Sequence, residues 1–180
     1  MEYCQPVWQS AKRIGMLYIF SGLPGTGKSS LATYLVREQQ AVYLRIDTIE
    51  QALRAGGVPI TGPEGYLVAY HIAADNLRLG MRVVADSVNP LHITRIAWRN
   101  VAKDVGVPFV EIEVICSDES EHRLRVETRA TDVAGLTLPT WDEVIRREYE
   151  PWDVAHVVID TAGQTVEDSS LTLRRALAAR

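Results

Sequence analysis

Short apolar runs and longer helical patterns alternate along the chain from residue 16 onward. Five runs rich in β-branched and aromatic residues predict strands at residues 16–20, 41–46, 82–86, 108–116 and 156–160. Between them, apolar positions three or four residues apart predict helices at about 27–39, 47–55, 64–79, 91–105, 118–129 and 140–149, with a final helix after 160. This alternation predicts parallel strands joined by helical crossovers.

The expected strands are continuously apolar instead of alternating between apolar and polar residues. Such strands are buried on both faces, as in a parallel sheet with helices on each side. We therefore expect an α/β fold with a doubly wound five-stranded parallel sheet. Residues 1–15 lack this periodicity and are expected to be an N-terminal extension, with one domain over 16–180.

Composition and charge narrow the class of protein. No apolar run approaches the roughly 20 residues needed to cross a bilayer, and the charged N-terminus lacks the apolar block of a secretory signal. Cys4 and Cys116 have no metal-ligand spacing. The net charge of −4 argues against a nucleic-acid surface, because such affinity depends on neutralising phosphates. We expect a cytoplasmic protein that is a monomer or weak homodimer and acts on a small molecule.

One segment carries a specific chemical pattern, G-x-x-x-x-G-K-S at residues 22–29, between an expected strand and an expected helix. Its glycines let backbone N–H groups turn toward an anion, and the following helix adds its positive N-terminal end. Lys28 then reaches the outer phosphates of a nucleotide, and the Ser29 hydroxyl takes one position on Mg²⁺. The expected ATP-binding residues are Gly22, Leu23, Pro24, Gly25, Thr26, Gly27, Lys28, Ser29 and Ser30.

The motif does not say where the γ-phosphate goes. A GTPase would carry an Asn-Lys-x-Asp guanine motif, which is absent from the chain. A motor-type ATPase commonly has a glutamate directly after its metal-side aspartate, whereas Ser87 follows Asp86 here. These observations favour a kinase, which needs a carboxylate for the acceptor hydroxyl and arginines for the transferred charge.

Two aspartates lie where a kinase would need them. Asp47 and Asp86 follow the second and third expected strands, and in an open parallel sheet the ligand crevice lies beyond the carboxyl ends of the strands. Asp47 is the candidate for accepting the proton of the acceptor, and Asp86 for binding Ser29 or a magnesium-bound water, although the roles can be exchanged. Helix N-capping is the alternative for both.

Residues 123–145 have the pattern of a lid, in which a helix, a Gly/Pro/Thr-containing stretch and a short helix follow one another. Arg129 is the candidate for the transferring phosphate and Arg125 for the ATP phosphates or the adenine face. A closed lid would exclude water from the reaction. Pairing of Arg125 with Glu121 is the alternative. Asn89 and Arg95 are candidates for the acceptor pocket, with an ordinary Asn-Pro turn as the favoured alternative for Asn89.

The segments "GLPGTGKSS", "RID", "VVADSVNP" and "HRLRVETR" followed by "LPTWDEV" together resemble a known family. They are similar to the small P-loop kinases called predicted kinases or AAA-domain ATP-binding proteins, a group akin to polynucleotide 5′-hydroxyl kinase domains, zeta toxins and chloramphenicol phosphotransferases. The resemblance spans about residues 16–160. It implies a strand order of 2-3-1-4-5, Asp47 as the acceptor-activating aspartate and Arg129 as the lid arginine.

The sequence therefore predicts an ATP- and Mg²⁺-dependent kinase for a hydroxyl of a small molecule or nucleotide. Two alternatives stay open. A polynucleotide 5′-hydroxyl kinase would share every motif and add a basic channel leading to Asp47. A nucleotide-binding regulatory module would bind ATP tightly with little or no transfer.

Overall fold

A computed structural model describes residues 15–180 of the chain, so the expected N-terminal extension lies outside the described residues apart from Gly15. Five parallel strands form one sheet in the order β2-β3-β1-β4-β5. The strands are β1 (Met16–Ser21), β2 (Val42–Arg45), β3 (Arg82–Asp86), β4 (Phe109–Ile115) and β5 (Val157–Asp160). The predicted fold class and strand order are confirmed.

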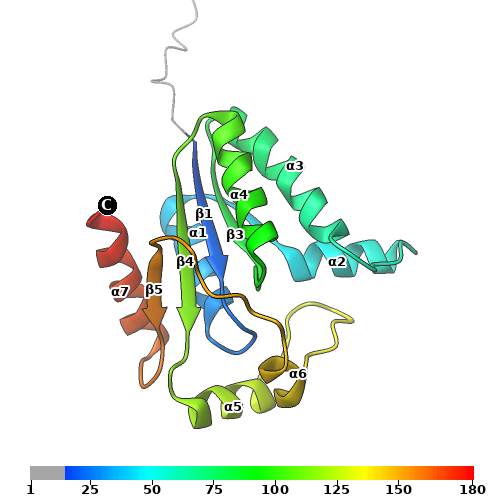
Figure 1. The fold of residues 1–180 in the computed structure, drawn as a ribbon, viewed down its shortest axis with the longest axis vertical. Helices are drawn as coiled ribbons and strands as arrows, with labels where there is room; N and C mark the ends of the chain where they lie inside the picture. Colours follow the sequence, from blue (N-terminus) through cyan, green and yellow to red (C-terminus); the bar gives the residue numbers. More distant parts are fainter. Residues whose placement is uncertain (1–14) are drawn as a thin grey trace, which may run out of the picture.

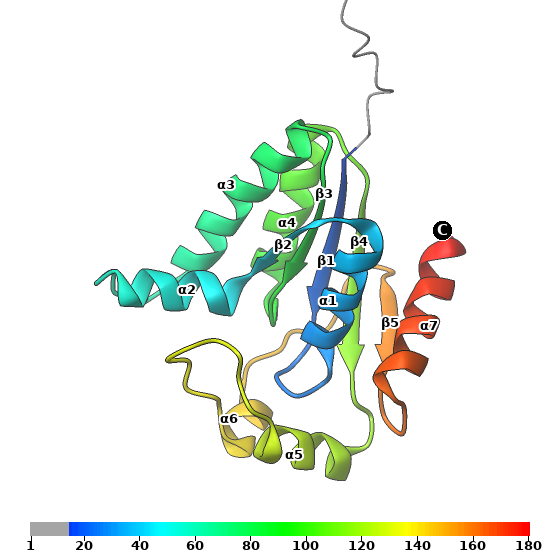
Figure 2. The same cartoon turned by 180° about the vertical axis from the view of Figure 1, so that it is seen from behind.

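Helices cover both faces of this sheet (Figures 1 and 2). The helices are α1 (Lys28–Gln39), α2 (Ile46–Ala55), α3 (Glu64–Arg78), α4 (His92–Val105), α5 (Glu119–Thr128), α6 (Trp141–Ile145) and α7 (Val166–Ala178). Helices α1 and α7 pack on one face, and α3 and α4 on the other. None of the helices in residues 15–180 has both the length and the apolar character required of a membrane span.

Strand β1 lies at the centre of two apolar cores. Tyr18 and Phe20 point to the core under α1 and α7, whereas Leu17 and Ile19 point to the core under α3 and α4. Successive side chains of a strand alternate between faces, so a strand with helices on both sides has to be apolar at every position. This is why β1 reads as a continuous apolar run.

All the strand arrows point toward the end of the molecule where α5 and α6 lie (Figure 1). The carboxyl ends of the strands, the loop between β1 and α1, and the segment from α5 through α6 therefore share one end of the domain. This arrangement places the phosphate motif, both aspartates and the lid arginines together.

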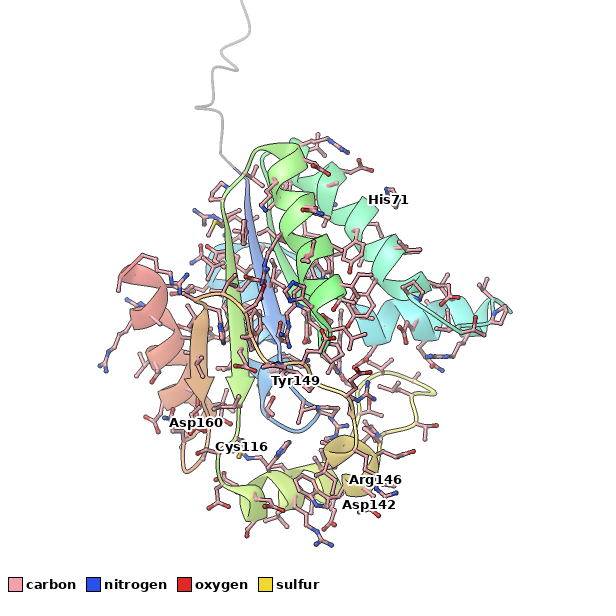
Figure 3. The ribbon with its side chains drawn as sticks, viewed as in Figure 1. His71, Cys116, Asp142, Arg146, Tyr149 and Asp160 are labelled. Carbon is pink, nitrogen blue, oxygen red and sulfur yellow. The ribbon has the colours of Figure 1, made fainter. Side chains whose placement is uncertain are left out.

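Helix α6 is shorter than predicted. It begins after Thr140, whose side chain forms a capping box with Glu143, and it ends at Ile145 instead of near Tyr149. Pro151 disfavours a helical conformation in the residue before it, and the Tyr149 hydroxyl donates a hydrogen bond to Glu113 of β4. Tyr149 accordingly lies on the irregular segment that leads from α6 back toward the sheet (Figure 3).

Candidate nucleotide and acceptor site

The loop after β1 has the conformation that anion binding requires. Gly25 and Gly27 have φ values of 89° and 88°, in the left-handed region that favours glycine. Gly27 is also the N-cap of α1 and has no side chain to satisfy the first N–H groups of the helix. Those N–H groups and the positive helix end are therefore available to an anion in the loop.

Most of the predicted nucleotide-binding residues line one large cleft. They are Leu23, Pro24, Gly25, Gly27, Lys28, Ser29 and Ser30. Gly22 and Thr26 lie behind the loop, where Gly22 donates to the Val88 carbonyl and the Thr26 hydroxyl donates to the Leu23 carbonyl. These two residues hold the shape of the loop from behind.

Lys28, which lines the cleft, forms a buried ion pair with Asp86. The Lys28 ammonium donates to one carboxylate oxygen of Asp86 at 2.5 Å, and the Tyr43 hydroxyl donates to the other at 2.6 Å. Burial works to raise the pKa of Asp86, but the charge and hydrogen bond of Lys28, with hydrogen bonds from Tyr43 and Ser29, outweigh it and lower that pKa. Asp86 is therefore an anion beside Ser29.

Asp47 lines the same cleft as Lys28 and lies in the first turn of α2. The N-cap of α2 is Arg45, and it makes no side-chain capping hydrogen bond. Asp47 is thus inside the helix and does not cap it, which sets aside the capping alternative. Its carboxylate faces the cleft without the buried ion pair that engages Asp86.

Arg129 lies at the end of α5 and is close enough to Asp47 for the two charges to interact. It is the C-cap residue of α5, it lines the cleft, and its buried Nε atom has no hydrogen-bond partner among the described residues. Burial lowers the pKa of Arg129, the charge of Asp47 opposes this, and the charge of Arg45 adds to it. Two guanidinium groups and one carboxylate therefore influence one another at this end of the cleft.

Arg125 lies beside the phosphate loop. Its guanidinium donates to the Thr161 hydroxyl at 2.8 Å and to Glu121 at 2.5 Å, so the expected alternative of a pair with Glu121 is present. The same Thr161 hydroxyl donates to the Thr26 carbonyl at 2.9 Å. Arg125 thus fastens the lid helix to the loop after β5 and still lines the cleft.

The structure places Asn89 and Arg95 away from the cleft, and we do not retain them as acceptor residues. Arg95 is fully buried, donates to the backbone carbonyls of Asn89, Pro90, Glu150 and Pro151, and stacks on the Trp152 ring at 4.1 Å. Asn89 is fully buried with φ 47° and donates its side-chain amide to Ser21. Asn89 lies in the irregular segment between β3 and α4, and Arg95 fixes the segment that leads from α6 to β5.

Sequence reasoning missed three residues of the site. Tyr43 and Arg45 project from β2, and Arg45 pairs with Asp132 of the lid loop at 2.7 Å. Arg45 lies opposite Asp86 in the register of β2 and β3. A charged residue at the end of an apolar strand was the available signal for Arg45, whereas Asp132 carried none because its partner is 87 residues away.

The cleft has room for two ligands. Its volume of about 2250 Å³ exceeds the roughly 300–1,000 Å³ of a site for one small molecule. The phosphate loop, Asp47 and Arg129 all belong to its lining. Such a cleft can hold a nucleotide and a second substrate with their reacting groups facing each other.

Comparisons with known proteins support the same fold. The family described as "AAA domain" matches residues 17–151. A probable adenylyl-sulfate kinase from Aeropyrum pernix is 26% identical over 169 residues, which cover 85% of this chain and 87% of the relative. An APS kinase from Mycobacterium tuberculosis, solved with AMPPNP and APS, is 20% identical with a TM-score of 0.69, over 91% of this chain and 98% of that one. A gluconokinase from Sinorhizobium meliloti is 19% identical with a TM-score of 0.62, over 93% and 94%.

Proposed function

The chain belongs to the AAA domain family, and from that membership and its cleft we propose that it is an ATP- and Mg²⁺-dependent kinase that phosphorylates a hydroxyl group of a small molecule or nucleotide. The observation that carries the proposal is the placement of Asp47 and Arg129 in the same cleft as the phosphate loop. We further propose that it acts in the cytoplasm, as a monomer or weak homodimer.

The nucleotide half of the cleft is assigned to the phosphate loop. The N–H groups of the loop and of the first turn of α1 bind the phosphates of ATP, with the glycines allowing close approach. Lys28 leaves Asp86 and moves to the outer phosphates, where its charge offsets the charge that builds up during transfer. Arg125 borders the same part of the cleft and contributes to binding the nucleotide.

The residues around Ser29 fit a magnesium ion. Asp86 is anionic and buried beside Ser29, and carboxylate and hydroxyl oxygens are ligands that Mg²⁺ prefers. No group of three or more His, Cys, Asp or Glu side chains within residues 15–180 could hold a metal by itself. A magnesium ion here would thus be bound by these residues together with nucleotide phosphates, which is its usual mode in proteins. It would supply positive charge to the phosphate oxygens.

The acceptor half is assigned to Asp47 and Arg129. An oxygen of the acceptor hydroxyl forms a bond to the γ-phosphorus, the bond from that phosphorus to the bridging oxygen of ADP breaks, and the hydroxyl proton passes to the Asp47 carboxylate. Arg129 neutralises charge on the transferred group, and its unpartnered Nε supports this assignment. Closure of the lid excludes water, which would otherwise accept the phosphate.

Two observations bear on the alternatives. The net charge of −4 disfavours a polynucleotide acceptor, because a nucleic-acid channel needs an excess of Lys and Arg. Its relatives include kinases named for small molecules, namely adenylyl sulfate and gluconate. A regulatory module that only binds ATP would not need Asp47 and Arg129 in the same cleft as the phosphate loop.

The test is phosphate transfer from γ-labelled ATP to a pool of hydroxyl-containing metabolites. We expect a labelled product with the wild type, loss of product with Asp47→Asn, and retention with Asp75→Asn, a matched change at an exposed residue of α3. ATP binding should persist in both variants. An Asp47→Asn variant as active as the wild type would show that the proton acceptor is another group.

A further inference from the structure

The partly buried arginines of residues 15–180 divide into two groups by their partners. Arg95 donates to four backbone carbonyls, Arg99 pairs with buried Glu111, and Arg125 binds Glu121 and Thr161. In Arg45 and Arg129, by contrast, a buried Nε atom has no partner among the described residues. Both arginines line the cleft.

Arg129 has less balancing charge around it than Arg45, on which Asp132 and Asp86 both act favourably. The charge of Arg45 acts on Arg129 as a repulsion, and Asp47 is the one carboxylate that acts favourably on Arg129. The partner of Arg45 is Asp132, a lid-loop residue whose side chain is 81% exposed. An ion pair with so exposed a member is weak, about 0–1 kcal/mol, and is readily exchanged for another anion.

Arg45 and Arg129 both line the cleft, and the proposed reaction supplies an anionic group for one of them. The γ-phosphate is assigned to Arg129, which leaves Arg45 with unused donors on the acceptor side, next to the end of β2. A guanidinium presents its N–H groups in a planar fork that matches carboxylate, phosphate and sulfate oxygens.

We propose that Arg45 determines the acceptor specificity: the acceptor carries an anionic group, a carboxylate, phosphate or sulfate, that binds Arg45 in place of Asp132 while its hydroxyl lies at Asp47. This inference rests on the proposed kinase function, since it uses the same cleft. It also explains why the lid loop places an aspartate on Arg45: Asp132 occupies the position of the acceptor's anionic group and holds the loop against the sheet.

The probe is inorganic sulfate, titrated by calorimetry at constant ionic strength into protein saturated with AMPPNP and magnesium, so that the phosphate loop is occupied. We expect sulfate to bind the wild type and the Kd to rise at least about tenfold in Arg45→Gln, because a charge-assisted bidentate contact is lost. Arg45→Lys should recover part of the affinity. Arg78→Gln, a matched change at an exposed residue of α3, should bind sulfate like the wild type.

Equal sulfate affinity in wild type and Arg45→Gln, or no sulfate binding to the nucleotide-loaded wild type, would overturn the inference. Circular dichroism of each variant distinguishes lost binding from lost folding. If AMPPNP itself fails to bind, the proposed kinase function is the part that fails. The same titration in a Lys28→Ala background, which lacks the ammonium of the phosphate loop, then still decides whether Arg45 binds an anion.

Discussion

Replacement of Lys28 by methionine should destabilise the folded protein as well as abolish ATP binding. Asp86 is 2% exposed, and its two oxygens accept hydrogen bonds from Lys28 and Tyr43. Without the ammonium, Asp86 either stays charged in a buried site or takes up a proton. Both outcomes raise the free energy of the folded state at neutral pH.

The size of this effect follows from the burial of both partners. Breaking a buried ion pair by removing one member costs about 3–5 kcal/mol. Tyr43 and Ser29 still donate to the carboxylate, so we expect the lower end, about 3 kcal/mol at pH 7. With a urea m-value of about 2 kcal/mol/M, the unfolding midpoint should fall by about 1.5 M.

The stability deficit of Lys28→Met should also change with pH in a defined direction. In the wild type the lowered pKa of Asp86 contributes stability that is present above the unfolded-state pKa and is lost as the pH falls through the folded-state pKa. In Lys28→Met, burial without a counter-charge raises the pKa of Asp86, so the folded state gains a proton more readily than the unfolded state. The stability deficit of the variant should therefore be largest at pH 7 and shrink toward pH 4.

Urea unfolding followed by circular dichroism at pH 7, 5 and 4 measures these deficits. The double variant Lys28→Met/Asp86→Asn removes both charges and should be more stable than the single variant at pH 7, because no buried charge is left unpaired. A single variant within about 0.5 kcal/mol of the wild type at pH 7 would be an ordinary surface effect. That result, or a deficit that does not change with pH, would refute the claim that Lys28 and Asp86 form a buried, charged pair.

Three further predictions address other parts of the site. Asp47→Asn should lower kcat by about 10²–10⁴-fold with unchanged calorimetric affinity for ATP; a change confined to ATP affinity would place Asp47 in the nucleotide half. Gly25→Ala should weaken ATP binding at least tenfold, because φ is 89° and the added Cβ would lie 2.5 Å from a methyl carbon of Val126; wild-type affinity would mean that the loop has another conformation when ATP binds. Arg95→Ala should lower the free energy of unfolding by about 2–4 kcal/mol, measured by urea titration, because four buried or partly buried carbonyls lose their donor; a loss of turnover with unchanged stability would restore Arg95 to the acceptor site.

The fold was predictable because the sequence patterns that define its strands and helices are local. Each strand is a mainly apolar run and each long helix has apolar positions at helical spacing, so the element order follows from short windows of sequence. Strand order came from the resemblance to P-loop kinases and not from periodicity. The end of α6 was predicted wrongly because contacts of Tyr149 and of the Glu150 and Pro151 carbonyls with distant residues override the helical pattern there.

The residues of the site likewise divide into those that a local motif identifies and those whose partners are distant in the sequence. The phosphate loop is contiguous, so its glycines and Lys28 could be identified from spacing alone. The role of Arg95 could not be, because its carbonyl partners at Glu150 and Pro151 are more than 50 residues away and no sequence pattern joins them. An arginine such as Arg95, near the start of a helix, looks the same in sequence whether it contacts a ligand or holds a loop in place.

The same distinction explains why the donor substrate is easier to infer than the acceptor. In the proposed function the triphosphate is held by backbone N–H groups, whose positions depend on a few glycines in one segment, and any acceptor-specific kinase can keep that segment unchanged. The acceptor half brings together Arg45 from β2, Asp47 from α2 and Arg129 with Asp132 from the lid. Its chemistry depends on which side chains are left without partners after folding, a property that only the three-dimensional arrangement defines. The Nε atoms of Arg45 and Arg129, which have no hydrogen-bond partner within residues 15–180, are such a property, and under our proposal they direct the search for the acceptor toward anionic hydroxyl compounds.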